Sequence, residues 1–387
     1  MINVIVTDVK YRMALAPIRE LAKKGYGIIA ADFENVPDKE RLGNYSKYIK
    51  SKISLSESEE KFVEDVKEIC KTERNILLPV NRKSLTKVIE NSNELGKYCD
   101  FLVPTKKALE LADDKNTICQ IAKKVGVPVP KTTSLEEHKD INEMAKSVNY
   151  PCIIKYRNGE AMGKKPKDRY KIVNNEEEFI KAYTEMDKID KNPIASDYIK
   201  GHDIGIAVVV NKEHKIVDFI CYESYREYPI EGGPTCFLKT IFSRKLLTYA
   251  SRLLEEIEFT GIAMLDFKGT VDKPYFLEIN PRVWGSANVV DVSKSTFFES
   301  YVKAAKNEKE PVNIEKCEAT YKKNIKMRFT PQSFACFMSH MKKSKHKIKI
   351  FCQYLASFFD VTVKDGLFAL NDVKPYVRYI LNTLKRI

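Results

Sequence analysis

Short apolar runs alternate with amphipathic stretches along roughly the first 110 residues of the chain. The apolar runs NVIVTDV and YGIIAADF are separated by residues whose apolar positions recur at helical spacing, and the stretch KSLTKVIENSNELGKY predicts one further helix. Strands that are apolar on both faces, with helices between them, are typical of a parallel sheet covered by helices. We therefore expect a Rossmann-like parallel-sheet domain, although TDVKYRM after the first strand lacks the glycine-rich fingerprint of dinucleotide binding.

The pattern changes between residues 110 and 130, where we place a domain boundary. A helix is predicted from about Lys115 to Val125, closed by Gly126 and followed by a Pro-x-Pro turn. The strand YPCIIKY, a helix around NEEEFIKAYTEM and the strand IASDYI come next. HDIGIAVVVN and KIVDFICYES then have the character of a hairpin.

The segment GIAMLDFKGTVDKPYFLEIN predicts an antiparallel hairpin that carries candidate metal ligands. Glu278 and Asn280 share one face of the second strand, while Leu277 and Ile279 point to the opposite side. Asp266 on the first strand can lie beside Glu278. Two carboxylates and an amide oxygen suit Mg²⁺ that completes its shell with phosphate oxygens. Ordinary surface acids on a hairpin are the alternative, but Asp, eleven residues, then Glu-x-Asn-Pro-Arg is a more specific order.

Cations that could hold phosphates occur at three places. Lys155 ends the apolar strand PCIIK, where its ammonium would leave the edge of the sheet, and Lys115 opens a helix after two aspartates. In a lysine-rich chain either one could equally be a surface lysine. Arg282 is better placed, directly after the candidate metal ligands, and its guanidinium geometry suits phosphate oxygens.

After about residue 310 the chain becomes basic and aromatic. Between Lys316 and Lys349, nine lysines and one arginine stand against a single acid, so this stretch carries +9 of the net +13. SFACFMSHMKKSKHKIKIFCQYLASFF predicts one or two amphipathic helices. Their apolar patch could pack on the core, contact a partner or touch a membrane surface, and we favour packing over the other two.

Composition narrows the class of protein further. The nine cysteines are dispersed, without a CxxC pair or a nearby histidine ligand, which favours reduced, mostly buried thiols and no zinc site. No stretch has the length of a membrane span, so we expect a cytoplasmic protein. No aromatic-and-arginine motif accompanies the lysines, so we expect no nucleic-acid partner. A homodimer is our preference for the assembly.

Four segments, in this order, carry a resemblance to a known family: DDKNTICQIAKKVGVPVPKT, YPCIIKYRNG, IASDYIKGHDIG and MLDFK…YFLEINPRVWGS. Over roughly residues 1–300 the chain resembles the ATP-grasp superfamily, specifically its carbamoyl-phosphate-synthetase-like carboxylate–amine ligases. The resemblance implies an α/β fold with a Rossmann-like (pre-ATP-grasp) domain over 1–110. An ATP-grasp fold would follow, with a small lobe over 111–195 and a large lobe over 196–310, and a basic helical extension over 311–387.

The resemblance implies contacts to the phosphates of ATP. Lys115 and Lys155 match the two basic residues that hold these phosphates, and Lys155 is also expected to serve catalysis. The usual glycine-rich phosphate loop is reduced here to Gly159 and Gly163 within a charged stretch. Lys171 is therefore expected to contribute a side-chain contact to phosphate.

The remaining nucleotide contacts follow from the same resemblance. Asp197, Tyr198 and Ile199 match the segment that links the two lobes, whose backbone reads the adenine edge. Asp203 stands where the family usually has an acid near the ribose or the phosphates.

The metal and catalytic residues are implied in the same way. Asp266, Glu278 and Asn280 match the magnesium ligands, although many relatives have Glu or Gln at the first position. Arg282 matches the arginine that stabilises the transferred phosphate and the acyl phosphate.

The segment EGGPTCF resembles the loop that covers the acceptor side. Gly232 and Gly233 would let its backbone approach the substrate. Tyr225 and Arg226 are candidate contacts to a substrate carboxylate. The alternative is that both are ordinary surface side chains without a role in binding.

The resemblance implies an enzyme that binds ATP and Mg²⁺, with Mn²⁺ as a substitute. Phosphorylation turns a small carboxylate into an acyl phosphate, which an amine attacks to form an amide-type bond with release of ADP and phosphate. The alternative is a non-catalytic or regulatory ATP-binding module with the same fold. The substrates, small molecules in either case, are not encoded in a pattern that we can interpret.

Overall fold

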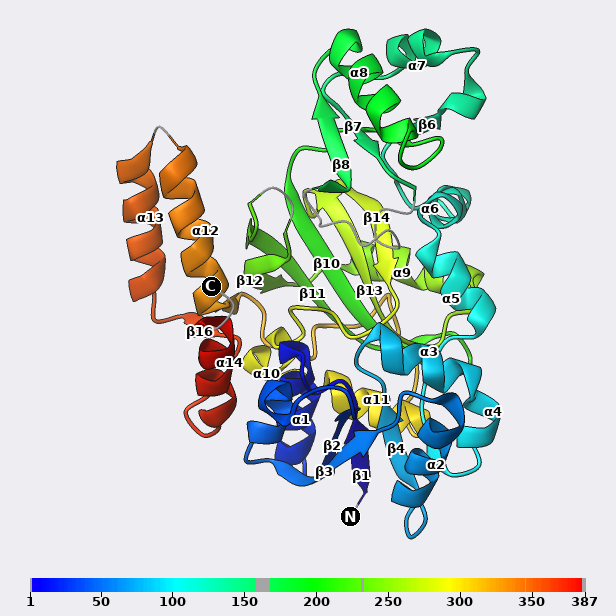
Figure 1. The fold of residues 1–387 in the computed structure, drawn as a ribbon, viewed down its shortest axis with the longest axis vertical. Coiled ribbons are helices and arrows are strands. Elements are labelled where there is room, and N and C mark those ends of the chain that lie inside the picture. Colours follow the sequence, from blue (N-terminus) through cyan, green and yellow to red (C-terminus); the bar gives the residue numbers. More distant parts are fainter. Residues whose placement is uncertain (1, 158–167, 231–232, 345, 385–387) are drawn as a thin grey trace.

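A computed structural model describes residues 2–157, 168–230, 233–344 and 346–384. In these residues the strands form three sheets (Figure 1). A five-stranded sheet near the N-terminus lies at one end of the molecule, a four-stranded sheet at the other end, and a seven-stranded sheet between them.

The first sheet is parallel throughout, in the order β3-β2-β1-β4-β5. Its strands are β1 (Asn3–Val6), β2 (Gly27–Phe33), β3 (Ile49–Leu55), β4 (Asn75–Leu78) and β5 (Cys99–Asp100). Its helices are α1 (Leu15–Lys23), α2 (Glu59–Ile69), α3 (Arg82–Glu90), α4 (Ser92–Leu95) and α5 (Lys106–Asp113). The predicted parallel sheet is confirmed, and its apolar strands β1, β2 and β4 are buried throughout. The single helix expected over KSLTKVIENSNELGKY is wrong, because α3 ends before Asn91 and α4 begins after it.

The four-stranded sheet is antiparallel, in the order β6-β9-β7-β8. Its strands are β6 (Thr132–Ser134), β7 (Cys152–Lys155), β8 (Tyr170–Val173) and β9 (Ile194–Asp197). The helices α7 (Ile141–Ser147) and α8 (Glu176–Asp187) pack on one face, where Cys152 and Ile154 are buried. Since side chains alternate along a strand, Lys155 points to the opposite face.

The seven-stranded sheet has the order β14-β13-β10-β11-β12-β15-β16 and is antiparallel except for the last pair. Its first five strands in the sequence are β10 (His202–Val210), β11 (Ile216–Glu227), β12 (Thr235–Ile241), β13 (Gly261–Gly269) and β14 (Pro274–Asn280). Three helices belong to this part: α9 (Arg244–Glu256), α10 (Val289–Ser293) and α11 (Phe297–Ala305). α11 packs against β10, β11 and α1, so the five-stranded and the seven-stranded sheets share one continuous apolar core. Trp284 is buried in that core against Phe297.

The basic C-terminal region is helical, as predicted, and also contains two strands that the sequence did not indicate. Its helices are α12 (Thr330–Lys343), α13 (Lys347–Phe359) and α14 (Lys374–Leu384). The strands β15 (Lys326–Arg328) and β16 (Val363–Asp365) extend the seven-stranded sheet beyond β12. Both are too short for periodicity to reveal them. Among the described residues, no helix is long and apolar enough to cross a bilayer.

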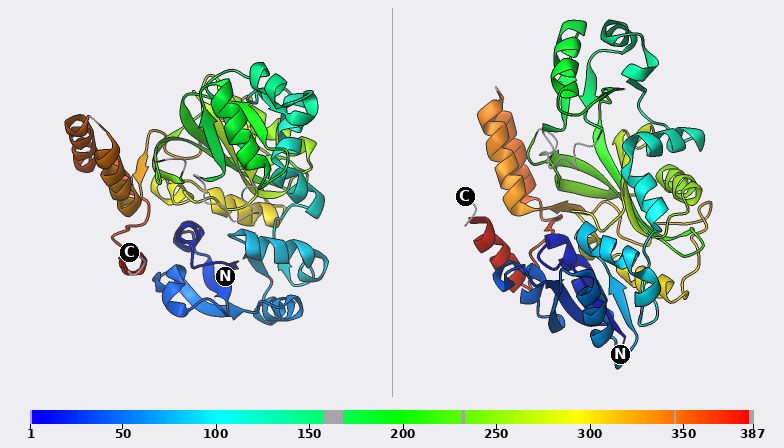
Figure 2. Two further views of the ribbon diagram at one scale, coloured as in Figure 1. Left: turned by 45° about the horizontal axis from the view of Figure 1, so that its top comes forward. Right: turned by 45° about the vertical axis from the view of Figure 1, so that its right-hand side comes forward.

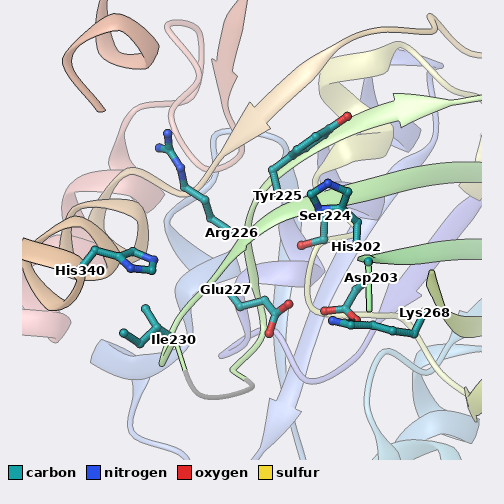
Figure 3. A pocket seen from close by; sticks show the side chains of 10 residues that line it. His202, Asp203, Ser224, Tyr225, Arg226, Glu227, Ile230, Lys268 and His340 are labelled. Carbon is teal, nitrogen blue, oxygen red and sulfur yellow. Dashed lines mark ion pairs between the residues drawn. The ribbon is translucent and has the colours of Figure 1, made fainter. Parts of the chain in front are cut away.

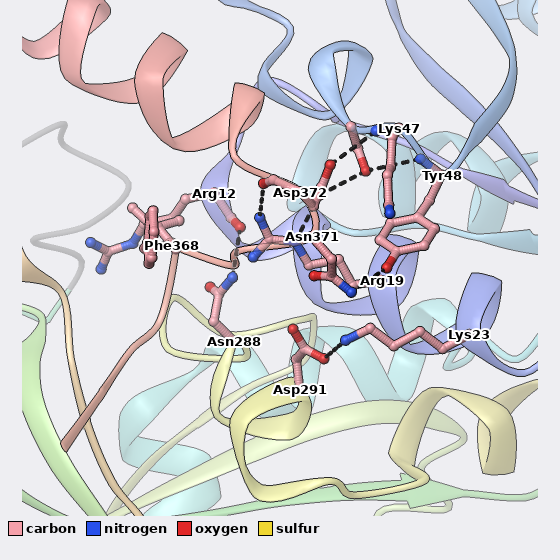
Figure 4. A network of polar contacts seen from close by, with 12 residues as sticks. Arg12, Arg19, Lys23, Lys47, Tyr48, Asn288, Asp291, Phe368, Asn371 and Asp372 are labelled. Carbon is pink, nitrogen blue, oxygen red and sulfur yellow. Dashed lines mark hydrogen bonds and ion pairs between the residues drawn. The ribbon is translucent and has the colours of Figure 1, made fainter. Parts of the chain in front are cut away.

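A buried ion pair ties the C-terminal region to the N-terminal domain (Figure 4). Arg19 on α1 donates through Nε to Oδ2 of Asp372 at 2.9 Å, and both side chains are almost fully buried. Ser46 donates its hydroxyl to the same carboxylate at 2.9 Å, and the backbone N–H of Lys47 donates to Oδ1 at 2.9 Å. Both carboxylate oxygens are thus satisfied, which a buried charge requires.

Removing this carboxylate should leave the Arg19 charge buried and unpaired. We expect Asp372→Ala to lower the free energy of unfolding by about 3–5 kcal/mol. Urea denaturation followed by circular dichroism measures the change. Glu68→Ala is the matched control, because Glu68 pairs with Lys71 on the surface and should contribute less than about 1 kcal/mol. Equal stabilities of the two variants would contradict the anchoring role of Asp372.

Candidate functional site

The predicted hairpin exists and its register brings the two candidate carboxylates together. β13 and β14 pair in an antiparallel manner, with Asp266 directly opposite Glu278 and Met264 opposite Asn280. A β-bulge follows, because Phe267 pairs with Phe276 and leaves Leu277 as the extra residue. The bulge turns Phe276 into the core while Glu278 and Asn280 keep to the other face, a device that is common beside active sites. Periodicity alone did not predict it.

Asn280 lies between the two carboxylates. Its Nδ2 donates to Oδ2 of Asp266 at 2.9 Å and contacts Oε1 of Glu278 at 3.4 Å. Arg282, two residues further along the chain, donates to the carbonyl oxygen of Val283 at 3.1 Å. Its charge partly opposes the burial that raises the pKa of Asp266. All four predicted residues of this hairpin and turn therefore belong to one cluster.

Lys115 reaches the cluster from helix α6 (Lys115–Lys124). The Asp114 side chain caps this helix by accepting from the N–H of Thr117 at 2.8 Å, so Lys115 is its first residue. α6 packs against β14, and the Lys115 ammonium lies 2.5 Å from Oε2 of Glu278. Cys119, one turn later, lies beside the same strand and was not among the predicted residues.

Lys155 approaches from the four-stranded sheet. Burial and the neighbouring charge of Lys115 lower the pKa of the Lys155 ammonium. The charge of Glu278 acts in the opposite sense. Two ammonium groups that repel each other beside one carboxylate could share a ligand with several negative charges.

The two carboxylates differ in their electrostatics. Burial raises the pKa of Asp266 well above its ordinary value, and the charges of Glu278 and Asp203 raise it further. Burial acts in the same direction on Glu278, but the attraction of Lys115 and of Lys155 outweighs it and lowers the pKa of Glu278. Asp266 is therefore the carboxyl of the pair whose ionised form is less favourable, and a nearby cation would favour that ionised form.

A tyrosine that the sequence analysis missed covers this cluster. Gly205 on β10 lies between Asp266 on β13 and Tyr222 on β11. A Cβ atom at Gly205 would stand 2.4 Å from the Tyr222 ring, so the ring lies directly over this glycine. Burial and the charge of Asp266 raise the pKa of the Tyr222 phenol. The sequence did contain an indication of this close approach, because Gly205 lies within a strand rich in Ile and Val.

A polar pocket of about 240 Å³ opens beside the cluster, at the adjoining ends of β10, β11 and β13 (Figure 3). Asp203 and Lys268 form an ion pair at 2.7 Å in its wall. Burial and the adjacent Asp203 raise the pKa of Glu227 to about 8. His340, from α12, closes the far side, so the C-terminal region contributes to this pocket. Of these, only Asp203 was predicted.

Lys171 does not join the other predicted residues. It pairs with Ile154 across β7 and β8 and forms an ion pair with Glu185 on α8, so it lies on the helix-covered face, opposite Lys155. The β8 residue on the Lys155 face is Tyr170, whose pKa is raised by burial and by the charge of Glu227. The expectation that Lys171 contacts phosphate from the Lys155 face is therefore not supported by its position, and Tyr170 is the β8 residue that pairs with Lys155. Gly159 and Gly163, from the predicted phosphate loop, lie outside the described residues.

The predicted acceptor residues are placed less favourably. Arg226 lines the pocket, but its guanidinium lies over the rings of Phe237 and Tyr354 and contacts the hydroxyl of Ser357 at 3.3 Å. Gly233 approaches the backbone of its own loop, where a Cβ would stand 2.1 Å from the carbonyl carbon of Tyr228. Gly232 lies outside the described residues.

The segment expected to bind the adenine edge through its backbone, residues 197–199, lies at the end of β9 and just after it. Asp197 is the last residue of that strand and contacts Nδ2 of Asn149 at 3.4 Å. Tyr198 is exposed and Ile199 half-buried, and the chain then enters β10 through Gly201, whose φ of +138° suits glycine alone. The segment thus connects the two sheets that carry Lys155 and Asp266.

Comparison with known proteins identifies the fold around this site. Residues 112–286 match the family model of the ATP-grasp domain. This range contains Lys115, Lys155 and the whole hairpin cluster. The predicted resemblance and the α/β fold class are therefore confirmed, and residues 112–286 are similar to the ATP-grasp domain.

The curated relatives are distant. The carbamoyl phosphate synthase large chain of Clostridium botulinum (strain Kyoto / Type A2) is 24% identical over 246 residues, which are 60% of this chain and 22% of that protein. The N5-carboxyaminoimidazole ribonucleotide synthase of Staphylococcus haemolyticus is 23% identical over 215 residues, which are 54% of this chain and 55% of that protein. The chain thus spans about a fifth of the first relative's length and just over half of the second's.

Solved structures share the fold at low identity. A biotin carboxylase–ATP complex from Campylobacter jejuni matches with a TM-score of 0.62 and 20% identity, covering 84% of this chain and 74% of that one. An L-amino acid ligase from Bacillus licheniformis matches with a TM-score of 0.54 and 12% identity, covering 84% and 78%. A biotin carboxylase domain from Hydrogenobacter thermophilus, in complex with MgADP and bicarbonate, matches with a TM-score of 0.59 and 17% identity, covering 84% and 73%.

The repulsion between the two cross-strand carboxylates gives a test of the site's electrostatics. We expect Asp266→Asn to raise the melting temperature in EDTA at pH 8 by at least about 2 °C, because a half-buried carboxyl whose raised pKa makes its ionised form unfavourable is replaced by a neutral amide. The new amide oxygen can still accept from Asn280. Differential scanning calorimetry measures the shift, and Glu213→Gln, on an exposed turn, is the control that should not move. A lower melting temperature for Asp266→Asn would show that the carboxylate is already compensated.

Proposed function

We propose that this protein is an ATP-dependent ligase that phosphorylates a small carboxylate and joins it to an amine. The observation that carries this proposal is the Asp266 and Glu278 pair on adjacent strands, with Lys115 at 2.5 Å from Glu278. Two half-buried carboxylates on adjacent strands repel each other, and binding a cation removes this repulsion. The ATP-grasp domain gives this arrangement its chemical context.

Magnesium-bound ATP is the ligand that fits this donor set. Asp266 and Glu278 would supply oxygens for Mg²⁺, which Mn²⁺ could replace. The Asn280 side chain would present its amide oxygen to the metal after a flip of the amide group by about 180°. Two carboxylates and an amide leave places for phosphate oxygens in an octahedral shell. Lys115 and Lys155 would then hold the phosphates that the metal does not neutralise.

The chemical step requires positioning and charge neutralisation. A carboxylate is a poor electrophile, because its negative charge repels nucleophiles. When its oxygen attacks the γ-phosphorus, the bond to ADP breaks and an acyl phosphate forms; the amine then attacks the carbonyl carbon and expels phosphate. We assign Arg282, whose charge acts on Asp266, to hold the transferred phosphate through both steps.

The adenosine part of ATP would lie along the link between the two sheets. We assign the adenine edge to the backbone of Asp197, Tyr198 and Ile199, and the ribose side to Asp203 in the polar pocket. Tyr170 faces the same space from β8. The acceptor side then falls to the region of Arg226, Gly232 and Gly233.

Turnover can be tested before the substrates are known. The protein, ATP, Mg²⁺, hydroxylamine and a panel of carboxylic and amino acids should yield ADP and a hydroxamate. Glu278→Gln should reduce ADP release by at least about a hundredfold while remaining folded, because the metal loses a charged ligand. Glu213→Gln is the matched control and should retain full activity.

Three outcomes would contradict this proposal. AMP in place of ADP would rule out the acyl phosphate, and a fully active Glu278→Gln variant would remove the metal assignment. Tight ATP binding without turnover on any carboxylate would favour a non-catalytic ATP-binding module.

Phosphate binding by Lys155 has a separate test. We expect Lys155→Gln to weaken ATP binding at least about tenfold in a calorimetric titration, since a buried cation that faces the phosphates is lost. Lys146→Gln, on the exposed surface of α7 in the same lobe, should bind as the wild type does. Equal affinities of the two variants would exclude Lys155 from the nucleotide site.

A further inference from the structure

Exposed apolar side chains gather in the C-terminal region. Of the nineteen large apolar side chains that are exposed among the described residues, thirteen follow residue 330. The helices α12 and α13 form an antiparallel hairpin at the edge of the large sheet (Figures 1 and 2). α12 buries Ser333 and Cys336 against that sheet, whereas α13 has no buried residue. The prediction that the apolar patch packs on the core is therefore confirmed for α12 and wrong for α13.

The exposed side chains of α13 form one stripe. At 100° per residue, positions 348, 351, 355, 358 and 359 fall within an arc of roughly 100°. Ile348 is 82% exposed and Phe359 is 71% exposed. Tyr354 lies outside this arc and stacks on Phe337 of α12 at 4.4 Å between ring centroids. Phe351, 48% exposed, also contacts Phe337, with the ring centroids 6.3 Å apart, so this edge of the stripe adjoins α12. We call the five residues the α13 stripe.

Positive charge borders the stripe. Lys347 and Lys349 lie about 100° to either side of Ile348, and both are exposed. Lys342 and Lys343 add two further charges at the end of α12. The sequence from residue 319 to residue 359 contains no Asp or Glu, so all charged side chains in this stretch are basic.

We infer that the α13 stripe docks this protein on an anionic lipid surface. An amphipathic helix that presents Phe, Leu and Ile between lysines lies in the plane of a bilayer interface, with its apolar face in the acyl boundary and its lysines among the headgroups. The inference does not depend on the proposed ligase reaction.

Charge decides between a lipid surface and a second copy of this chain. In a symmetric dimer through the stripe, the lysines of one hairpin would meet those of the other, because a two-fold contact repeats the same patch on both sides. Lysines that face one another without acids repel, whereas acidic phospholipids attract them.

The hairpin is mounted firmly at its base. Lys326 pairs with Asp360 at 2.7 Å, and Arg328 donates to the carbonyl oxygen of Ser357 at 3.1 Å. Arg226, in the pocket wall, contacts Tyr354 and Ser357 of α13. A docked hairpin would therefore orient the pocket relative to the lipid surface.

Sedimentation of the full chain with vesicles tests the inference. In 50 mM salt we expect binding to vesicles of phosphatidylcholine with 30% phosphatidylglycerol, and little binding to phosphatidylcholine alone. Ile348→Ser with Phe359→Ser should weaken the partition coefficient at least about tenfold, since two apolar side chains are no longer buried. Lys347→Gln with Lys349→Gln should weaken it by roughly 25-fold, at about fivefold per lysine.

Matched controls separate the stripe from general surface effects. Ile189→Ser removes an apolar side chain that is 55% exposed on the small lobe, and Lys71→Gln removes an exposed lysine on the N-terminal domain. Both should bind as the wild type does. Circular dichroism of each variant checks that the helices persist.

Several outcomes would overturn the inference. These are no sedimentation with anionic vesicles in low salt, equal binding to neutral vesicles, or unchanged binding of both double variants. A dimer in solution that Ile348→Ser with Phe359→Ser converts to a monomer, without vesicle binding by the wild type, would make a second copy the occupant instead.

Discussion

The repulsion between two half-buried carboxylates is the constraint on which the rest of this structure depends. Asp266 and Glu278 lie directly opposite each other on adjacent strands, and burial strengthens the cost of holding both charges. The fold compensates one of them with Lys115, which a capped helix delivers to Glu278. Asp266 has no such ion pair among the described contacts, accepts a hydrogen bond from Asn280, and has a raised pKa because of burial and the charge of Glu278. A site of this kind is prepared for a cation and for the anionic ligand that the cation carries.

The architecture supplies the remaining groups from separate sheets. The large sheet carries the carboxylates, and the four-stranded sheet brings Lys155 from the opposite side. The bulge at Leu277 allows Phe276 to anchor the strand in the core while Glu278 faces the ligand. The C-terminal region closes the pocket through His340 and is itself fastened to the N-terminal domain by the buried Arg19–Asp372 pair. Residues that are far apart in the chain form one site, because each is held on a helix or strand of the fold.

Much of this arrangement could be predicted from the sequence, and the failures have physical causes. The spacing of Asp266, Glu278 and Asn280 predicted one face of one hairpin, because alternation and turn chemistry are local. Tyr222 and Lys268 were missed because they reach the site through strand pairing between distant segments. Lys171 was assigned to the site without regard to strand alternation, which places it on the wrong face of its sheet. β15 and β16 are three residues each, and only the edge of an existing sheet specifies them.

The dependence of nucleotide binding on magnesium tests this account most directly. Calorimetric titration with ADP, in EDTA and then in Mg²⁺, should show at least about tenfold tighter binding with the metal in the wild type. The Asp266→Asn, Glu278→Gln double variant should bind ADP with the same affinity in both buffers. The account would be contradicted by a wild type that is indifferent to Mg²⁺, or by a double variant whose response to Mg²⁺ equals that of the wild type.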